Sequence, residues 1–287
     1  MKINFKKIMP LRPDKADKNF FGRVLIAAGS RGMTGAAYLA CKAAYRSGAG
    51  IVYCALPESE AFIVSCLIPE AVIIALPSSR GFIKPRAYKI VSEKIKKFKI
   101  DVLALGPGLG EGGREFAVNL LNSVKIPCVI DADALNALAQ NKEYLPKLKN
   151  RPCILTPHEG EMKRLIGDFS ERIKAAYKLS NITSGAALLK GANSVVCEGK
   201  KVYVSSFASS ALSKGGSGDV LTGITAAIWA QIGKQKKDFR KTAFQSAALS
   251  VEIHALAGKI AAEKIGERSL LASDIADFIG EAFKRIK

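Results

Sequence analysis

A glycine-rich run at residues 215–223 has the composition of a phosphoryl-transfer site. It reads Gly-Gly-Ser-Gly-Asp-Val-Leu-Thr-Gly and precedes a long apolar segment. Gly216, Ser217 and Gly218 would leave main-chain amides free at the start of a helix, where they can bind the charge on a transferring phosphoryl group. Asp219 would lie beside them and could take the proton of an attacking hydroxyl. We therefore predict an anion hole with Asp219 as the catalytic base, rather than an N-cap behind a flexible linker.

Two other glycine-rich turns directly follow short apolar runs. Residues 29–35 read Gly-Ser-Arg-Gly-Met-Thr-Gly, and residues 106–113 read Gly-Pro-Gly-Leu-Gly-Glu-Gly-Gly. Such turns let backbone amides approach a phosphate, and for the first turn a tight strand-to-helix connection is an equally good interpretation. Gly108, Gly110 and Gly113 also match the G-x-G-x-x-G spacing of dinucleotide-binding proteins. That match begins three residues after the predicted strand, so a Rossmann fold is the minority interpretation.

Acidic and histidine side chains follow two further apolar runs. The sequence Asp-Ala-Asp-Ala-Leu-Asn occupies residues 131–136. Asp131 could hold Mg²⁺ through water or orient a substrate hydroxyl, whereas we interpret Asp133 as an N-cap. His158 stands at the entrance to a predicted helix, where ligand contact is favoured. Glu161, near the same helix start, is expected to be a simple helix-end charge.

The elements that would position these residues alternate along the chain. The predicted strands are Val24–Ala28, Ile51–Ala55, Val72–Leu76, Val102–Leu105, Cys128–Ile130, Cys153–Leu155 and Ser194–Cys197. The predicted helices are Gly35–Ser47, Pro85–Phe98, Arg114–Asn122, Ala134–Asn141, Glu159–Ile166, Asp219–Gln231, Phe239–Ile265 and Ser273–Ile286, with a basic linker at Gly233–Lys237. Apolar strands without alternation indicate a mostly parallel sheet with helices on both faces, an α/β fold with a helical C-terminal third.

Composition limits the classes of partner. The 287 residues carry a formal net charge of +19, and 48% are hydrophobic. This charge attracts anions such as nucleotides, but charge alone does not indicate nucleic-acid binding. The six cysteines form no Cys-x-x-Cys pair, so we expect neither a zinc site nor disulfides. There is no signal peptide and no apolar run of ~18 residues, so we expect a cytoplasmic protein that does not enter membranes.

The motifs together resemble a known family. Residues 215–219 resemble the anion hole and catalytic Asp of the ribokinase-like superfamily. In order along the chain, residues 29–37, 106–110, 131–136, 156–161, 189–191 and 215–219 resemble motifs of the ADP/ATP-dependent NAD(P)H-hydrate dehydratases. The resemblance runs from about residue 20 to the C-terminus. It implies a ribokinase-like fold and an enzyme that phosphorylates the C6 hydroxyl of hydrated NAD(P)H and eliminates phosphate.

The resemblance also implies site residues. Asp219 matches the base at the substrate hydroxyl, and Gly218 would cradle the phosphoryl group. Positions that contact the hydrate are matched by Ala36, Gly108 and His158. The segment beside the nucleotide is matched by Lys190, Gly191, Ala192, Asn193 and Ser194. The co-substrate would be ADP, usual in bacteria and archaea, or ATP, usual in eukaryotes, with Mg²⁺ as cofactor.

Three departures from the family pattern concern the site. Ser217 stands where Thr is frequent, which keeps the hydroxyl. Glu159 stands where Pro is common and adds a negative charge beside His158. A stretch that often contains Asn reads Ser-Ser-Ala-Leu at 209–212, so a polar contact to the nucleotide is expected to differ.

The resemblance extends to domain organisation and assembly. We expect one domain over residues 1–287, with residues 1–20 as an N-terminal extension and no fused epimerase domain. We expect a homo-oligomer, a tetramer by family resemblance. The alternative is a ribokinase-like small-molecule kinase, such as a hydroxyethylthiazole kinase, which would use Asp219 but release a stable phosphate ester. The glycine turns favour the dehydratase, because a bulky dinucleotide needs close backbone approach.

Overall fold

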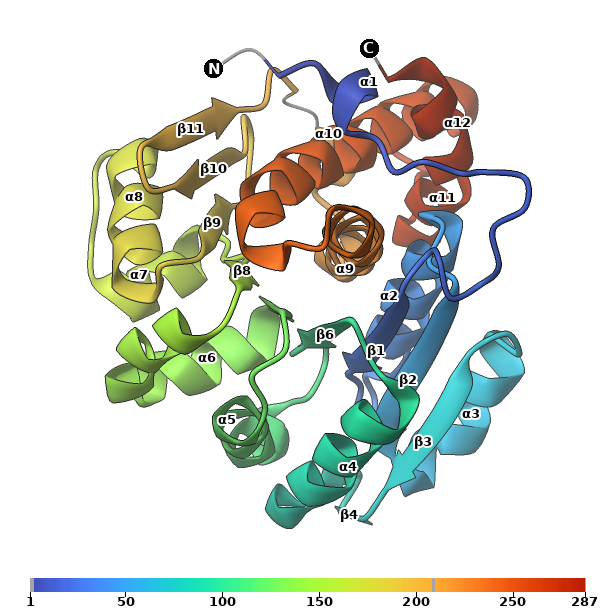
Figure 1. Ribbon diagram of the computed structural model, residues 1–287, viewed down its shortest axis with the longest axis vertical. Helices are drawn as coiled ribbons and strands as arrows, with labels where there is room; N and C mark the ends of the chain where they lie inside the picture. Colours follow the sequence, from blue (N-terminus) through green and yellow to red (C-terminus); the bar gives the residue numbers. More distant parts are fainter. Residues whose placement is uncertain (1–2, 208–209, 287) are drawn as a thin grey trace.

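A nine-stranded sheet forms the centre of the molecule. The computed structural model describes residues 3–207 and 210–286, and the sheet order is β11-β10-β9-β8-β7-β6-β1-β2-β3 (Figure 1). The strands are β1 (Arg23–Ala27), β2 (Ile51–Pro57), β3 (Val72–Leu76), β6 (Val102–Leu105), β7 (Cys128–Ile130), β8 (Cys153–Leu155), β9 (Ala186–Leu189), β10 (Val195–Glu198) and β11 (Lys201–Val204). A small separate hairpin pairs β4 (Ser78–Ser79) with β5 (Phe82–Ile83).

Seven of these strands, from β3 across to β9, run parallel, and β10 and β11 complete the sheet as antiparallel strands. Parallel strands lie between two layers of helices, so side chains on both faces must be apolar. The central strand β1 shows this alternation: Val24 and Ile26 pack into one core, and Leu25 and Ala27 into the other. All four side chains are fully buried.

Helices cover both faces of the sheet (Figure 1). One layer contains α1 (Phe5–Ile8), α2 (Thr34–Arg46), α3 (Ala61–Leu67), α9 (Ser217–Lys236), α10 (Phe239–Ile265), α11 (Ala272–Asp277) and α12 (Ile279–Arg285). The other contains α4 (Tyr88–Phe98), α5 (Arg114–Ser123), α6 (Ala132–Gln140), α7 (Glu159–Ile166) and α8 (Arg172–Thr183). Within the described ranges, no helix has the length and apolar character needed to cross a membrane.

The predicted α/β architecture is confirmed, including a helical C-terminal region, which runs from α9 to α12 in the described part of the chain. Two predicted details are wrong. The segment Gly233–Lys237 is no linker, because α9 continues through Lys236 and ends where Lys237 adopts a left-handed conformation. The predicted helix Ser273–Ile286 is two helices, α11 and α12, that meet at Phe278.

Candidate active site

The two glycine-rich turns of the parallel strands lie against each other at the carboxyl edge of the sheet. The Gly29 amide donates to the Pro107 carbonyl at 2.8 Å, and the Ser30 hydroxyl donates to the Gly108 carbonyl at 2.9 Å. Gly108 has φ +61°, and a Cβ there would lie 2.8 Å from the Cβ of Ala36. Two of the residues matched to hydrate contacts, Ala36 and Gly108, are therefore neighbours, and only glycine permits their close approach.

The third glycine-rich run forms the start of α9. Gly216 is its N-cap with φ +88°, and a Cβ there would lie 2.5 Å from Cδ1 of Leu39. The Ser217 amide donates to the Lys214 carbonyl at 3.2 Å, so it is engaged inside the loop. Within the described residues, the amides of Gly216, Gly218 and Asp219 have no such partner. The free donors expected at a helix start are thus present here, but Ser217 offers its hydroxyl and not its amide.

Ser217 also contacts a histidine that the sequence motifs did not indicate. Its Oγ lies 3.1 Å from Nε2 of His254, which comes from α10. Burial lowers the pKa of His254 to about 4, so the imidazole is neutral near pH 7. A neutral buried ring can hold the Ser217 hydroxyl in place without adding charge to the site.

Asp219 lies in the first turn of α9 and is partly buried. Burial raises the pKa of its carboxyl to about 7, and the negative charge of Asp131 acts in the same direction. In the described part of the chain no hydrogen bond holds this carboxylate. A carboxyl that titrates near neutral pH and keeps its lone pairs available is suited to general base catalysis.

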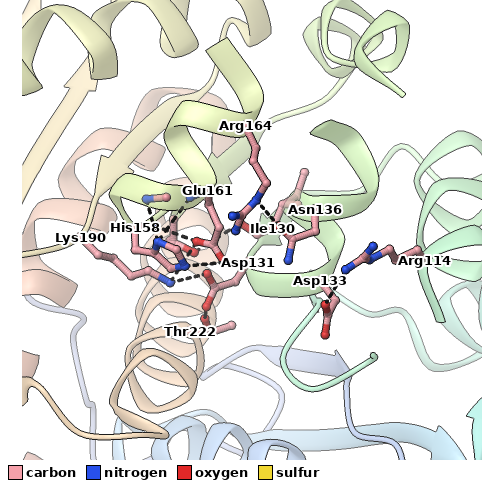
Figure 2. Close-up of polar contacts among 12 residues, drawn as sticks. Arg114, Ile130, Asp131, Asp133, Asn136, His158, Glu161, Arg164, Lys190 and Thr222 are labelled. Atoms are coloured by element: carbon pink, nitrogen blue, oxygen red, sulfur yellow. Dashed lines mark hydrogen bonds and ion pairs between the residues drawn. The ribbon is translucent and has the colours of Figure 1, made fainter. Parts of the chain in front are cut away.

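A buried ion pair that acts on the pKa of Asp219 connects the ends of two strands. Lys190 Nζ donates to Asp131 Oδ1 at 2.6 Å, and the Thr222 hydroxyl donates to Asp131 Oδ2 at 2.6 Å (Figure 2). Asp131 is 1% exposed. Burial opposes the charge on Lys190, but attraction to Asp131 and Glu161 outweighs it and raises the lysine pKa. A Cβ at Gly218 would lie 3.5 Å from Lys190 Nζ, so a fixed positive charge stands beside the free amides.

His158 and Glu161 form a capping box at the start of α7 (Figure 2). His158 Nδ1 accepts the Gly160 and Glu161 amides at 3.0 and 3.3 Å, and Glu161 Oε2 accepts the His158 amide at 2.8 Å. Glu161 was expected to be a simple helix-end charge, but it is 4% exposed. Burial raises its pKa to about 7, although Lys190, 3.9 Å away, acts against this. After Asp219, it is the second carboxyl of the site whose pKa is raised to about 7.

The prediction that Asp133 is an N-cap is wrong. Strand β7 ends at Ile130, so Asp131 occupies the cap position of α6 and Asp133 falls in the first turn. Its Oδ2 accepts the Gly110 amide at 2.8 Å, and its Oδ1 lies 3.9 Å from Arg114 Nη2. Asp133 thus fixes the glycine turn that carries Gly108.

A cavity of about 370 Å³ opens beside the start of α9. Its lining includes Lys190, Gly191, Ala192, Ser194 and Gly218, which were expected beside the nucleotide, and also His158, Ser217 and His254. Asn193 is not among the lining residues. Its amide side chain donates to the Ser205 carbonyl at 3.0 Å, so it shapes the loop.

The structure shows what surrounds two of the positions at which the sequence departs from the family pattern. Glu159 forms an ion pair with Arg172, which also donates to the Leu189 and Lys190 carbonyls. Arg172 thereby neutralises the extra negative charge of Glu159 and connects the start of α7 to the loop that carries Lys190. In the stretch 209–212, residue 209 lies outside the described residues, whereas Leu212 lines the cavity.

The acidic residues of the site suit Mg²⁺ only if the ion is also bound by the phosphates of a ligand. Among the described residues there is no cluster of three or more His, Cys, Asp or Glu side chains that could hold a metal ion. Asp131 is already occupied by Lys190 and Thr222. Mg²⁺ commonly binds through substrate phosphates, waters and one or two carboxylates. Asp131, the predicted magnesium residue, is 1% exposed, so it could reach Mg²⁺ only through such waters.

Comparison with known proteins assigns the family. The NAD(P)H-hydrate dehydratase family matches residues 24–281. The chain belongs to this family. It is 35% identical to the bifunctional NAD(P)H-hydrate repair enzyme Nnr of Moorella thermoacetica, over 97% of this chain and 52% of that enzyme. The chain thus spans about half the length of this curated relative.

Solved structures agree with the family assignment. The ADP/ATP-dependent NAD(P)H-hydrate dehydratase of Bacillus subtilis, co-crystallised with ATP and Mg²⁺, superposes with a TM-score of 0.78 at 25% identity. That match covers 99% of this chain and 96% of the other. The hydroxyethylthiazole kinase of Pyrococcus horikoshii shares the fold, with a TM-score of 0.59 and 13% identity over 98% and 94% of the two chains. A ribokinase-like superfamily protein of Enterococcus faecalis superposes with a TM-score of 0.81 at 21% identity, over 98% and 93% of the two chains. The ribokinase-like fold is thus confirmed, and the family is not that of Rossmann dehydrogenases.

Proposed function

We propose that this protein restores NAD(P)H from its hydrate, with ADP or ATP as the phosphoryl donor. The observation that carries the proposal is the carboxyl of Asp219, which has a pKa of about 7 and stands at the start of α9. Beside it are the free amides of Gly218 and Asp219, the Lys190 ammonium and the 370 Å³ cavity. This arrangement suits transfer of a phosphoryl group to a hydroxyl and is consistent with membership of the dehydratase family.

In the first step, Asp219 accepts the proton of the C6 hydroxyl while that oxygen attacks the terminal phosphorus of the nucleotide. The bond between this phosphorus and the nucleotide oxygen breaks. The Gly218 amide and Lys190 stabilise the charge that spreads over the phosphoryl oxygens. Mg²⁺, when bound with the nucleotide, supplies further neutralisation of phosphate charge. Ala36, Gly108 and His158 hold the hydrate, while Gly191, Ala192, Asn193 and Ser194 form the loop beside the nucleotide.

In the second step, the C6–O bond breaks and phosphate leaves with its electron pair. C5 loses a proton, and the C5–C6 double bond of NAD(P)H forms. Transfer followed by elimination explains why the nucleotide is consumed although the organic product carries no additional phosphate.

The test is to incubate the protein with NADH hydrate or NADPH hydrate, Mg²⁺ and either ADP or ATP. We expect the absorbance of reduced nicotinamide to return, with release of one inorganic phosphate per molecule repaired. Accumulation of a stable phosphate ester, without NAD(P)H, would instead indicate a small-molecule kinase. The two nucleotides and the two hydrates, assayed separately, identify the preferred donor and substrate.

We further propose that the protein acts in the cytoplasm as a homo-oligomer, a tetramer by family resemblance, and that residues 1–287 form one domain. Light scattering on the purified protein tests the assembly. A single cooperative unfolding transition tests the domain organisation.

A further inference from the structure

A second hollow of about 430 Å³ lies against α6, between the start of α5 and α7, and extends to Lys142 just past the C-terminal end of α6. It is lined by Arg114, Asn136, Ala139, Gln140, Lys142 and Arg164. Its volume falls within the range of small-molecule sites, which is roughly 300–1,000 Å³. Nothing in the proposed reaction at Asp219 uses this hollow.

The charge of this hollow is positive and only partly neutralised. Three of its six lining residues are cationic and none is acidic. Arg164 Nε donates to the Asn136 side chain at 2.9 Å, and in the described part of the chain Arg164 has no ion pair. Arg114 has only long ion pairs, 3.4 Å to Glu111 and 3.9 Å to Asp133. Its Nε is buried and has no hydrogen-bond partner among the described residues.

The hollow adjoins both segments that are expected to hold the hydrate. Arg114 begins α5 directly after the turn that contains Gly108. Arg164 lies on α7, and a Cβ at Gly160 would lie 2.9 Å from the His158 ring and 3.8 Å from Arg164 Nη1. Figure 2 shows the order across the site, from Lys190 and His158 past Arg164 to Arg114.

His158 lines the cavity at Lys190 and Gly218, and Arg164 of the same helix lines the second hollow. The cavity at Lys190 and Gly218 takes the phosphoryl donor in the proposed reaction. A hydrated nicotinamide dinucleotide is much longer than its reacting ring, and its diphosphate and adenylate half must extend away from Asp219. The direction past His158 and Arg164 leads to this hollow, with its three lining cations and no lining acid. Another hollow of the same charge, at Arg12, Arg46 and Lys284, lies at the C-terminal end of α2, away from Ala36 in the first turn of that helix.

We propose that the hollow lined by Arg114, Lys142 and Arg164 binds a phosphate group of the dinucleotide substrate that is remote from the reacting ring. This inference rests on the proposed function. Planar guanidinium groups bind phosphate oxygens in pairs, and Asn136 holds Arg164 in the orientation needed. The phosphate is either the diphosphate, common to both hydrates, or the 2′-phosphate that only NADPH hydrate carries.

Arg164→Gln is the principal variant, because this side chain is exposed and its loss leaves no buried charge unpaired. Lys142→Gln is the second variant on the hollow. Lys163→Gln is the matched control, because it removes the same charge from the neighbouring position of α7, where Lys163 pairs with Asp168 and does not line the hollow. Thermal unfolding of each variant checks that it is folded.

Binding is measured by calorimetry, with NADP⁺ and NAD⁺ titrated into protein saturated with ADP and Mg²⁺. We expect Arg164→Gln to weaken NADP⁺ binding by roughly 10- to 100-fold, with a smaller loss for Lys142→Gln and none for Lys163→Gln. Weakening of NADP⁺ alone assigns the hollow to the 2′-phosphate, and equal weakening of NAD⁺ assigns it to the diphosphate. Unchanged binding of both by Arg164→Gln overturns the proposal.

Hydrate repair separates this inference from the proposed function. If the wild-type protein repairs hydrate and Arg164→Gln matches Lys163→Gln in KM for both hydrates, the proposed function stands and the phosphate site is wrong. If the wild-type protein repairs neither hydrate but loses NADP⁺ affinity on Arg164→Gln, the phosphate site stands and the proposed reaction is wrong.

Discussion

Replacement of Asp219 by Asn should abolish turnover and at the same time stabilise the folded protein. The carboxyl has a pKa of about 7 in the folded protein, against an ordinary value of 3.8. Each pKa unit corresponds to about 1.4 kcal/mol, so ionised Asp219 destabilises the fold by at most about 4 kcal/mol. Because the side chain is partly open to solvent, we expect about 2 kcal/mol. Loss of a general base typically lowers the rate by about 10²- to 10⁴-fold.

The effect on stability has a defined pH dependence. Below pH 4 the Asp219 carboxyl is protonated in both the folded and the unfolded chain, so it does not affect their balance. Between about pH 4 and pH 7 the unfolded chain releases the proton and the folded protein retains it, so the wild type loses stability relative to Asp219→Asn. Above about pH 7 the difference is constant. Over the same range, wild-type activity should fall as pH drops below about 7.

Urea denaturation of both proteins at pH 4.5 and pH 8, followed by circular dichroism, measures this difference. The advantage of Asp219→Asn should increase by about 2 kcal/mol between the two pH values. A variant that is less stable than the wild type at pH 8 would show that the carboxylate is well solvated or hydrogen-bonded, and the argument for a raised pKa would be refuted. Near-normal repair by the variant would refute the assignment of the base.

Three further substitutions test the surroundings of Asp219. His158→Ala should raise the KM for hydrate more than that for nucleotide in steady-state kinetics, and the opposite order would place the ligands the other way round. Lys190→Met leaves the buried Asp131 carboxylate without its cation, so the free energy of unfolding in urea should fall by about 3–5 kcal/mol; unchanged stability would contradict this. Gly216→Ala places an alanine at φ +88°, with its Cβ 2.5 Å from Leu39 Cδ1. Calorimetry should therefore show a lower melting temperature, and kcat should fall. Wild-type values would show that the turn accommodates the methyl group.

Most of the parallel sheet could be predicted from the sequence, because its buried strands are short apolar runs rich in Val, Ile and Leu. Strand β9 was missed because it consists of Ala186, Ala187, Leu188 and Leu189. These residues favour helices, and only pairing with β8 and β10 makes them a strand. Strand β11 was missed because it is a short edge strand, Lys-Val-Tyr-Val, that begins with an exposed lysine and so gives no continuous apolar run.

The candidate site was predicted where its residues form local motifs and missed where they meet only in the fold. Gly216 to Asp219 could be found from spacing at the start of a helix. The contact between Asp131 and Lys190 joins residues 59 positions apart, and no local pattern indicates it. His254 lies inside an apolar helix, 37 positions from Ser217, where a histidine is ordinarily a core residue. Glu161 was misjudged because burial depends on α7 packing against the sheet.

The connection that carries residues 190–194 joins neighbouring antiparallel strands, β9 and β10, whereas strands of the parallel part are joined through helices. A change in its length therefore alters neither the register of the parallel strands nor the packing of a crossover helix. Lys190 is fixed by Asp131, but residues 191–193 are exposed. Insertions or exchanged segments at these three positions offer a way to engineer donor choice while the rest of the scaffold is left intact.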